Sequence, residues 1–393
     1  MMIPDPPAHT PDPEPEVAPA HPHPRVSLRS LLLAFLKVGT IGFGGGMGML
    51  ALLREEVVRR RRWIDDGQLG VAVAMGQMLP GPFITNYAQY IGYGLRGTRG
   101  MALAVVGLMA PSFVLMCLLS WLYGRFGEVP VAARLFAGVQ PVVTGILVWA
   151  TVGIGRVHLR NRRAFVIAAA AFVALWFRVD VLLVVLGAGL LGIVLSGAWR
   201  RLPAAPAFLP WLLPAAVSAP ANARALELAF VFLKIGAVVF GGGFAAIPFI
   251  QQEVVDIRGW LTATEFLDGV ALGQMTPGPV AITATFVGYR VLGLPGALLA
   301  TVAVLLPSYL MLFGLIHVYR RIRNHPLVKG FLAGVMPAVT GMLLTAAVYL
   351  GRAAIHGPAA AVVGLLSLAL LLRFRIEPVW LVLGGALVGL VIG

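Results

Sequence analysis

Two lysines are the residues best placed to do chemistry in this chain, because each stands inside an otherwise apolar segment. Lys37 lies in the segment 28–53, and Lys234 lies in the segment 226–250. A charged side chain at membrane depth is costly and is a functional candidate by default. Its ammonium group could neutralise an anion, although a lysine can also extend to the interface or form a structural ion pair. We favour the role toward an anion.

Each lysine is followed six residues later by a Phe-Gly-Gly-Gly run. Glycine is a poor helix former, so three in a row are expected to unwind the helix. Unwound backbone at membrane depth has to be buried or line a cavity, where its N–H groups can bind an anion. Close helix packing through small residues is the alternative. The residues concerned are Phe43, Gly44, Gly45, Gly46, Phe240, Gly241, Gly242 and Gly243.

Two Pro-Gly-Pro turns make a similar case. Two prolines remove two N–H donors and disfavour helix in the residue before each, so no helix runs straight through. A half-helix that starts after the second proline directs its positive end into the membrane. Neutral amides and hydroxyls flank both turns and could bind oxyanion oxygens, while a purely structural kink is the alternative. The residues are Gln77, Pro80, Gly81, Pro82 and Asn86, and Gln274, Pro277, Gly278, Pro279 and Thr283.

The carboxylates are few and are placed, by the sequence, at segment ends or in loops. Glu56 and Glu253 occupy equivalent positions and could couple proton movement, but a salt bridge to a nearby arginine is favoured. Asp268 is assigned to a segment end as well. No buried carboxylate cluster, cysteine pair or catalytic motif is recognised, so we expect no metal, no cofactor and no enzyme activity.

Composition indicates a membrane protein. Of the 393 residues, 59% are hydrophobic and 12% are charged, whereas a soluble domain carries about 25% charged residues. The 30 Lys and Arg exceed the 16 Asp and Glu. The arginines lie between apolar runs, which is typical of a topology signal and argues against nucleic-acid binding.

The chain contains an internal repeat. FLKVGTIGFGGG at 35–46 returns as FLKIGAVVFGGG at 232–243, GQMLPGP at 76–82 returns as GQMTPGP at 273–279, and AGVQPVVTG at 137–145 returns as AGVMPAVTG at 333–341. Such duplication is typical of secondary transporters. The predicted organisation is a disordered Pro-rich tail at 1–26, a first repeat at 27–200, a linker at 201–223 and a second repeat at 224–393.

The arginine pattern suggests how the repeats are oriented. If the Pro-Gly-Pro segment re-enters, the loop after the third segment is poor in arginine in the first half and rich in the second. The predicted fold is therefore an all-α polytopic integral membrane protein whose two homologous halves form an inverted-topology repeat. Each half has about five spans plus a Pro-Gly-Pro broken or re-entrant segment.

The doubled FGGG, GQMxPGP and AGVxPxVTG blocks resemble the chromate ion transporter family in its long, two-domain form. The resemblance covers about residues 30–392. It implies a secondary active transporter that exports chromate from the cytoplasm across the bacterial inner membrane, driven by the proton-motive force, and confers chromate resistance. Its motif positions coincide with Lys37, Phe43–Gly46, Gln77, Pro80–Pro82 and their equivalents in the second half.

The partners that follow are chromate or a sulfate-like oxyanion and the lipid bilayer, with no nucleic acid and with a homodimer left open. Two alternatives remain at this stage. One is a transporter whose cargo is sulfate or another oxyanion. The other is an anion channel, although the sequence offers no ring of pore-lining charges.

Overall fold

A computed structural model of the chain describes residues 26–43, 45–127, 129–198, 223–374 and 376–392. Nearly all of the predicted tail and linker therefore lie outside the described residues. Every regular element in the described part is helical, which confirms the all-α class.

The two halves are built from matching elements. The first contains α1 (Leu28–Ile41), α2 (Gly45–Arg54), the π-helical η1 (Glu55–Arg60), α3 (Asp66–Met78), α4 (Phe83–Phe126), α5 (Pro130–His158), α6 (Arg162–Trp176) and α7 (Val181–Leu195). The second contains α8 (Ala223–Val238), η4 (Gly243–Ala245), α9 (Ala246–Gln251), the π-helical η5 (Gln252–Ile257), α10 (Ala263–Met275), η6 (Val280–Ile282), α11 (Thr283–Ile322), α12 (Pro326–Ala354), α13 (Pro358–Arg373) and α14 (Pro378–Ile392).

Local sequence explains several helix starts. The starts of α3 and α10 carry equivalent capping boxes, in which Asp65 pairs with Gln68 and Thr262 pairs with Glu265. Such boxes satisfy two of the free N–H groups at a helix start. Proline occupies the first turn of α5, α12 and α13, where its missing N–H costs nothing.

The first apolar segment of each half is broken, which differs from a single span. α1 ends at Ile41 and α2 begins at Gly45; α8 ends at Val238 and η4 begins at Gly243. With 14 residues, α1 reaches about 21 Å at 1.5 Å per residue, short of the ~30 Å hydrocarbon layer. The break of the second half contains Gly241 and Gly242, as the poor helix propensity of glycine predicts, whereas in the first half Gly45 and Gly46 already belong to α2.

The half-helix after each Pro-Gly-Pro turn runs on into the next apolar segment. α4 passes through a kink at Arg96 and Gly97, and α11 passes through an equivalent kink at Leu292 and Gly293. The two glycines have φ of 60° and 65°, a conformation that a side chain disfavours. Each long helix therefore consists of a short arm and a long arm.

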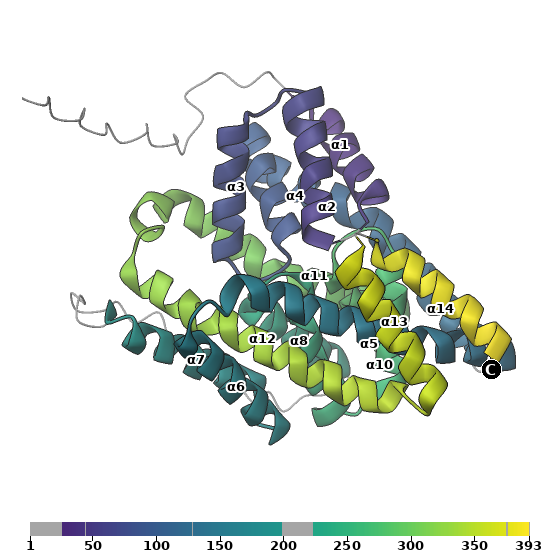
Figure 1. Cartoon of the computed structure of the whole chain (residues 1–393). Helices are drawn as coiled ribbons and strands as arrows, with labels where there is room; N and C mark the ends of the chain where they lie inside the picture. The colour runs from purple at the N-terminus through teal and green to yellow at the C-terminus, as the bar shows by residue number, and fades with distance from the viewer. Residues whose placement is uncertain (1–25, 44, 128, 199–222, 375, 393) are drawn as a thin grey trace, which may run out of the picture.

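The halves interlock (Figure 1). The last two helices of the first half, α6 and α7, pack on α12 of the second, while α13 and α14 pack on α5 of the first. Small residues allow this approach: a Cβ on Gly138 of α5 would lie 2.1 Å from the carbonyl oxygen of Gly385, and one on Gly334 of α12 would lie 1.9 Å from that of Ala188. Such close packing is characteristic of membrane helices.

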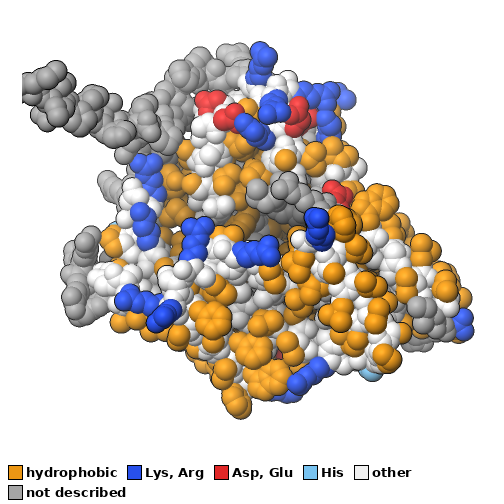
Figure 2. Space-filling view, viewed as in Figure 1, with side chains coloured by type: hydrophobic (Ala, Val, Ile, Leu, Met, Phe, Trp, Pro, Cys, Tyr) orange, Lys and Arg blue, Asp and Glu red, His pale blue; other side chains and the backbone are white. Residues whose placement is uncertain are grey.

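Four helices are long and apolar enough to cross a membrane within the described part of the chain, namely α4, α5, the stretch Val280–Tyr319 and α12. Figure 2 shows hydrophobic side chains over the lower part of the molecule, while many Lys and Arg side chains gather toward the top. Exposed leucine, valine and phenylalanine side chains occur along α4, α6, α7, α11, α13 and α14. A surface of this kind suits a lipid environment.

Candidate functional site

The four helix breaks of the two halves meet in pairs. The N–H of Gly81 donates to the carbonyl oxygen of Val239 over 2.7 Å, and the N–H of Gly278 donates to that of Gly42 over 2.7 Å. In both bonds the Pro-Gly-Pro turn of one half meets the glycine-rich break of the other. Backbone groups freed by the breaks are thereby satisfied without water.

These turns require glycine. Gly81 has φ +93° and Gly278 has φ +112°, where residues with a side chain are strained. A Cβ on Gly278 would lie 2.1 Å from Ser112 Oγ, and one on Gly81 would lie 3.1 Å from Ser308 Cβ. The Ser112 hydroxyl also donates to the carbonyl of Pro277. Ser112 and Ser308 occupy equivalent positions of the repeat, so a serine of each half packs against the Pro-Gly-Pro turn of the other half.

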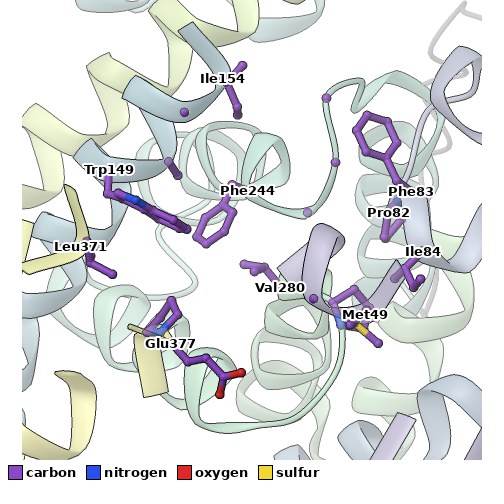
Figure 3. A pocket seen from close by; sticks show the side chains of 18 of the residues that line it. Met49, Pro82, Phe83, Ile84, Trp149, Ile154, Phe244, Val280, Leu371 and Glu377 are labelled. Carbon is purple, nitrogen blue, oxygen red and sulfur yellow. The ribbon is translucent and has the colours of Figure 1, made fainter. Parts of the chain in front are cut away.

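A cavity of about 730 Å³ lies beside these turns (Figure 3). Its wall combines Pro82, Phe83 and Ile84 at the start of α4, Trp149 and Ile154 of α5, Phe244, Val280, and Glu377 before α14. Figure 3 shows Trp149 and Phe244 beside each other at this cavity, and their rings meet edge-on at 6.4 Å. The volume is far larger than one small tetrahedral anion needs, so the site is a vestibule with room for water.

The positive charge at this cavity comes from the backbone. The starts of α4 and η6 lie in the wall, and the first N–H groups of a helix have no partner within it. Their partial positive charge favours an anion. Among the described lining residues Glu377 is the sole charged side chain.

The predicted site residues divide into three groups. Pro82, Pro279 and Gly241–Gly243 line the cavity. Asn86 and Thr283 fasten the turns, since Asn86 Nδ2 donates to the carbonyls of Gly76 and Pro80 at 3.1 Å each and the Thr283 hydroxyl donates to the carbonyl of Val280 at 2.8 Å. The third group lies outside the described cavity wall: Lys37, Phe43, Gln77, Pro80, Gly81, Lys234, Phe240, Gln274, Pro277 and Gly278. Gly44 lies outside the described residues, and Gly45 and Gly46 are placed only as the first two residues of α2.

Two of the predicted polar residues have a side-chain atom that could form a further hydrogen bond. The Oδ1 of Asn86 and the Nε2 of Gln274 are buried and have no hydrogen-bond partner within the described structure. Gln89 lies one helical turn beyond Asn86, and both polar atoms of its side-chain amide, Nε2 and Oε1, also lack a partner within the described structure. Buried polar groups of this kind normally bind water or a ligand.

The predicted lysines form ion pairs. Lys37 Nζ lies 2.6 Å from Glu56 Oε2, and Arg61 Nε lies 2.6 Å from the other oxygen of the same carboxylate. Glu56 is only 4% exposed, whereas Lys37 is 42% exposed. Lys37 therefore forms the ion pair that was the alternative to its role toward an anion. Glu56 forms the salt bridge that was favoured over a role in proton coupling.

An equivalent cluster exists in the second half, where Glu253 contacts both Lys234 and Arg258. Arg61 and Arg258 also lie over Trp63 and Trp260, at 4.8 and 5.5 Å from the ring centroids. We call the two clusters the Lys37 triad (Lys37, Glu56, Arg61) and the Lys234 triad (Lys234, Glu253, Arg258).

The two triads differ in their contact to the opposite half. Lys234 has a second carboxylate partner, Asp180 of the first half, at 3.5 Å. Gln252 adds two bonds there, because its Oε1 accepts from the N–H of Val181 at 2.7 Å and its Nε2 donates to the carbonyl of Val179 at 2.9 Å. The repeat equivalent of Asp180 is Glu377, and in the described structure no ion pair joins it to Lys37.

Sequence reasoning missed several residues. Trp149, Phe244 and Glu377 line the cavity without belonging to a recognised motif. Glu377 could have been found as the equivalent of Asp180, since RVDV at 178–181 returns as RIEP at 375–378. Asp268 is not at a segment end but inside α10, 4% exposed. Its signal was an acid within the run EFLDGVALG.

Interlocked helical halves with apolar outer faces and broken helices around a shared cavity define a polytopic helical membrane protein of the transporter type. The chromate transporter family model matches residues 29–193 and again residues 226–390. The chain therefore belongs to the chromate transporter family in its two-copy form, and it is not an enzyme.

Relatives of known name cover nearly the whole chain. It is 33% identical over 384 residues to the "Chromate transport protein" of Cupriavidus metallidurans, covering 94% of each chain. It is 32% identical over 366 residues to the "Probable chromate transport protein" of Synechococcus elongatus, covering 88% of this chain and 91% of the relative. It is 36% identical over 340 residues to the "Chromate transport protein" of Pseudomonas aeruginosa, covering 81% and 80%. No solved structure matches the chain.

Proposed function

We propose that this chain is a secondary active transporter that exports chromate from the cytoplasm across the bacterial inner membrane, driven by the proton-motive force. The observation that carries the proposal is the cavity at which the helix breaks of both halves converge. A dehydrated dianion needs hydrogen-bond donors, and the N–H groups at helix starts supply them together with a partial positive charge. The names of the relatives supply chromate as the cargo.

Within this proposal the substrate site is formed by the wall residues Pro82, Pro279 and Gly241–Gly243, together with the free N–H groups at the starts of α4 and η6. The unpartnered Nε2 of Gln274 is the predicted side-chain donor best able to add a hydrogen bond to the anion, whereas the unpartnered atom of Asn86 is an acceptor. Lys37 and Lys234 contribute when an ion pair opens and an ammonium group turns to the passing anion. Glu56 and Glu253 would then hold the ion pairs in the resting state.

The two halves form an inverted repeat in this proposal, with the Pro-Gly-Pro segment of each half re-entering the membrane, namely α3 to the start of α4 in the first half and α10 to the start of α11 in the second. Reciprocal contacts support it, because the two cross-half backbone bonds at the turns, from Gly81 and from Gly278, are equivalent with the halves exchanged. Transport would exchange the conformations of the halves and so expose the turns to the opposite side.

The test is flux in liposomes reconstituted with the purified full chain, under imposed pH and voltage gradients. We expect saturable chromate movement against its own gradient when a proton gradient is imposed. Gly278→Val is the loss-of-function variant, and Gly314→Ala is its control, because a Cβ at Gly314 meets nothing within 4 Å. Chromate moving only down its gradient would mean a channel and would refute the proposal.

A competition series settles the cargo. Sulfate, molybdate and chromate are each offered at equal concentration against labelled chromate. If sulfate inhibits more strongly than unlabelled chromate does, the protein is a transporter for sulfate or a related oxyanion. The geometry supports this as the second candidate, because backbone N–H donors bind any tetrahedral dianion of similar size.

A further inference from the structure

We propose that Asp268 is the site at which the driving proton binds and is released, an inference that rests on the proposed proton-coupled transport. Asp268 lies on α10, the helix that leads into the second Pro-Gly-Pro turn, and its side chain is buried. Its carboxylate Oδ2 accepts from the Tyr123 hydroxyl at 2.8 Å, and its Oδ1 accepts from Gln140 Nε2 at 2.9 Å. Both partners belong to the first half, so this carboxylate bridges the halves.

The hydrogen bonds that Tyr123 and Gln140 make to Asp268 are compatible with either an ionised or a protonated carboxyl group. A tyrosine hydroxyl can donate to an ionised carboxylate or accept from a protonated one by rotating its hydrogen. The Gln140 amide can donate to the remaining oxygen in both cases. A buried carboxylate with neutral partners is therefore held in place without being fixed in one charge state.

Within the described part of the chain, no lysine or arginine forms an ion pair with the Asp268 carboxylate, whose hydrogen-bond partners are Tyr123 and Gln140. Glu265 lies one turn earlier on α10 and pairs with Arg290 of α11 at 2.6 Å. Arg290 also lies over the Tyr123 ring at 5.5 Å. The other elements packed against α10 are α4, α5, α12, α14 and η6, of which α14 and η6 contain no ionisable side chain. The basic side chains of α4 are Arg96, Arg99 and Arg125. The ionisable side chains of α5 and α12 are Arg134, Arg156 and His158, and Lys329, Tyr349 and Arg352.

This environment contrasts with that of Glu56 and Glu253, each of which contacts a lysine and an arginine. Opposite charges at hydrogen-bond distance stabilise the ionised carboxylate. A coupling group has to change its charge in every cycle, and the carboxylate without a cation is better suited to do so.

The repeat supplies an internal comparison. The equivalents of Asp268, Tyr123 and Gln140 are Val71, Tyr319 and Met336. Val71 and Tyr319 belong to one apolar cluster. The same site is thus polar in one copy and apolar in the other, and a structural requirement of the fold cannot explain the carboxylate. One proton site per molecule follows.

In the cycle, Asp268 takes a proton from water when α10 moves away from α4 and α5, and returns it to water on the opposite side. The protonated carboxyl is neutral and enters the buried position at lower desolvation cost than the ionised form. The anion itself undergoes no bond change. The proton gradient acts by favouring the protonated, reburied state on one side of the membrane.

The experiment compares two readouts in the same proteoliposomes: chromate accumulation under an imposed pH gradient, and exchange of labelled for unlabelled chromate at equal pH. Asp268→Asn keeps the shape but cannot bind a proton. We expect it to retain exchange and to lose gradient-driven accumulation to the level of protein-free liposomes. Glu265→Gln, one turn away on α10, is the matched control and keeps both.

The outcomes separate the hypotheses. Gradient-driven accumulation that survives Asp268→Asn overturns the inference, and so does loss of exchange together with accumulation, since that indicates a structural or substrate-binding role. Wild-type protein without any gradient-driven accumulation instead refutes the proposed function. If Asp268→Asn fails to fold, Tyr123→Phe takes its place: it retains the carboxylate and should displace the pH profile of accumulation, and an unchanged profile contradicts the inference.

Discussion

The Lys37 and Lys234 triads are built alike but stand in different relations to the opposite half. The Lys234 triad contacts the Asp180 loop of the first half, and Gln252 binds that loop on both sides of Asp180. In the described structure no ion pair joins the Lys37 triad to Glu377, which lies in the wall of the 730 Å³ cavity. A cavity of about 380 Å³ lies on the equivalent side, with Asp180 in its wall.

Under the proposed alternating transport, this difference corresponds to one of two reciprocal states of the molecule. Sequence equivalence gives each half the groups for both arrangements: Asp180 and Glu377 precede the last helix of each half. In the reciprocal state we expect Lys37 to contact Glu377 and Lys234 to leave Asp180. The two states would then differ in few ion pairs and be close in energy, as alternation requires.

The largest expected effect concerns the turns that both states share. Gly278→Ala places a Cβ 2.1 Å from Ser112 Oγ, whereas Gly81→Ala places one 3.1 Å from Ser308 Cβ. Both also suffer from positive φ. Overpacking costs about 1–3 kcal/mol, so Gly278→Ala should lower the yield of monodisperse protein and the transport rate more than Gly81→Ala does.

Size-exclusion chromatography and flux measure this pair, with Gly314→Ala as the control. Adding Ser112→Ala to Gly278→Ala should restore part of the loss, because it removes the clashing hydroxyl. Equal behaviour of the two glycine variants would show that the turns are not packed differently.

The next effect concerns access to the two cavities. Ile154 lines the large cavity, while its repeat equivalent Leu350 is 0% exposed. In a background with Cys117→Ser, which removes the sole cysteine, Ile154→Cys should react with a water-soluble maleimide much faster than Leu350→Cys. Rates are measured by mass shift, with denatured protein as the reference. Faster labelling at position 350 would contradict the assignment of the larger, accessible cavity to the side of Ile154.

A smaller effect concerns the triads themselves. Both lysines are partly exposed and an arginine remains on each carboxylate, so the cost of removing a lysine lies near that of an exposed ion pair, about 1 kcal/mol, and well below that of a fully buried one. Lys234 is 24% exposed and Lys37 is 42% exposed, and only Lys234 also contacts Asp180. Lys234→Ala should therefore lower the thermal unfolding temperature more than Lys37→Ala.

Thermal unfolding in detergent, followed by fluorescence, gives the two shifts. The double variants Lys37→Ala/Glu56→Gln and Lys234→Ala/Glu253→Gln remove the unpaired charge and should recover part of the stability. A larger shift for Lys37→Ala would contradict the assignment of the cross-half ion pair to the Lys234 triad alone.

The sequence predicts much of this molecule because the repeat marks the same positions twice. The breaks at the glycine runs and at the Pro-Gly-Pro turns follow from helix propensity and from the missing N–H groups of proline. The cross-half bonds from Gly81 and Gly278 could not be predicted, because they depend on how the halves interlock. The sequence also could not predict that α6 and α7 pack on α12 of the second half while α13 and α14 pack on α5 of the first, because long-range packing decides this arrangement.

The lysines show where a local argument reaches its limit. Burial depth correctly marked Lys37 and Lys234 as unusual, and the structure pairs each with the glutamate 19 residues further along its own half. Helix periodicity cannot reveal this pairing, because the chain reverses at the glycine run between them. Asp268 was missed for the opposite reason: a lone acid in an apolar run could not be distinguished from one near a helix end.

The smallest expected effect tests the asymmetry at a single charge. Glu377 faces the large cavity without an ion-pair partner in the described structure, whereas Asp180 contacts Lys234. At about 10 Å in a water-like medium, removing one negative charge strengthens binding of a dianion roughly fourfold. Glu377→Gln should therefore lower the KM for the anion by about that factor, and Asp180→Asn should not. The gain should shrink as salt is raised, because the Debye length is about 8 Å at 0.15 M. A gain that persists in high salt would mean that Glu377 acts by packing or by its predicted contact to Lys37.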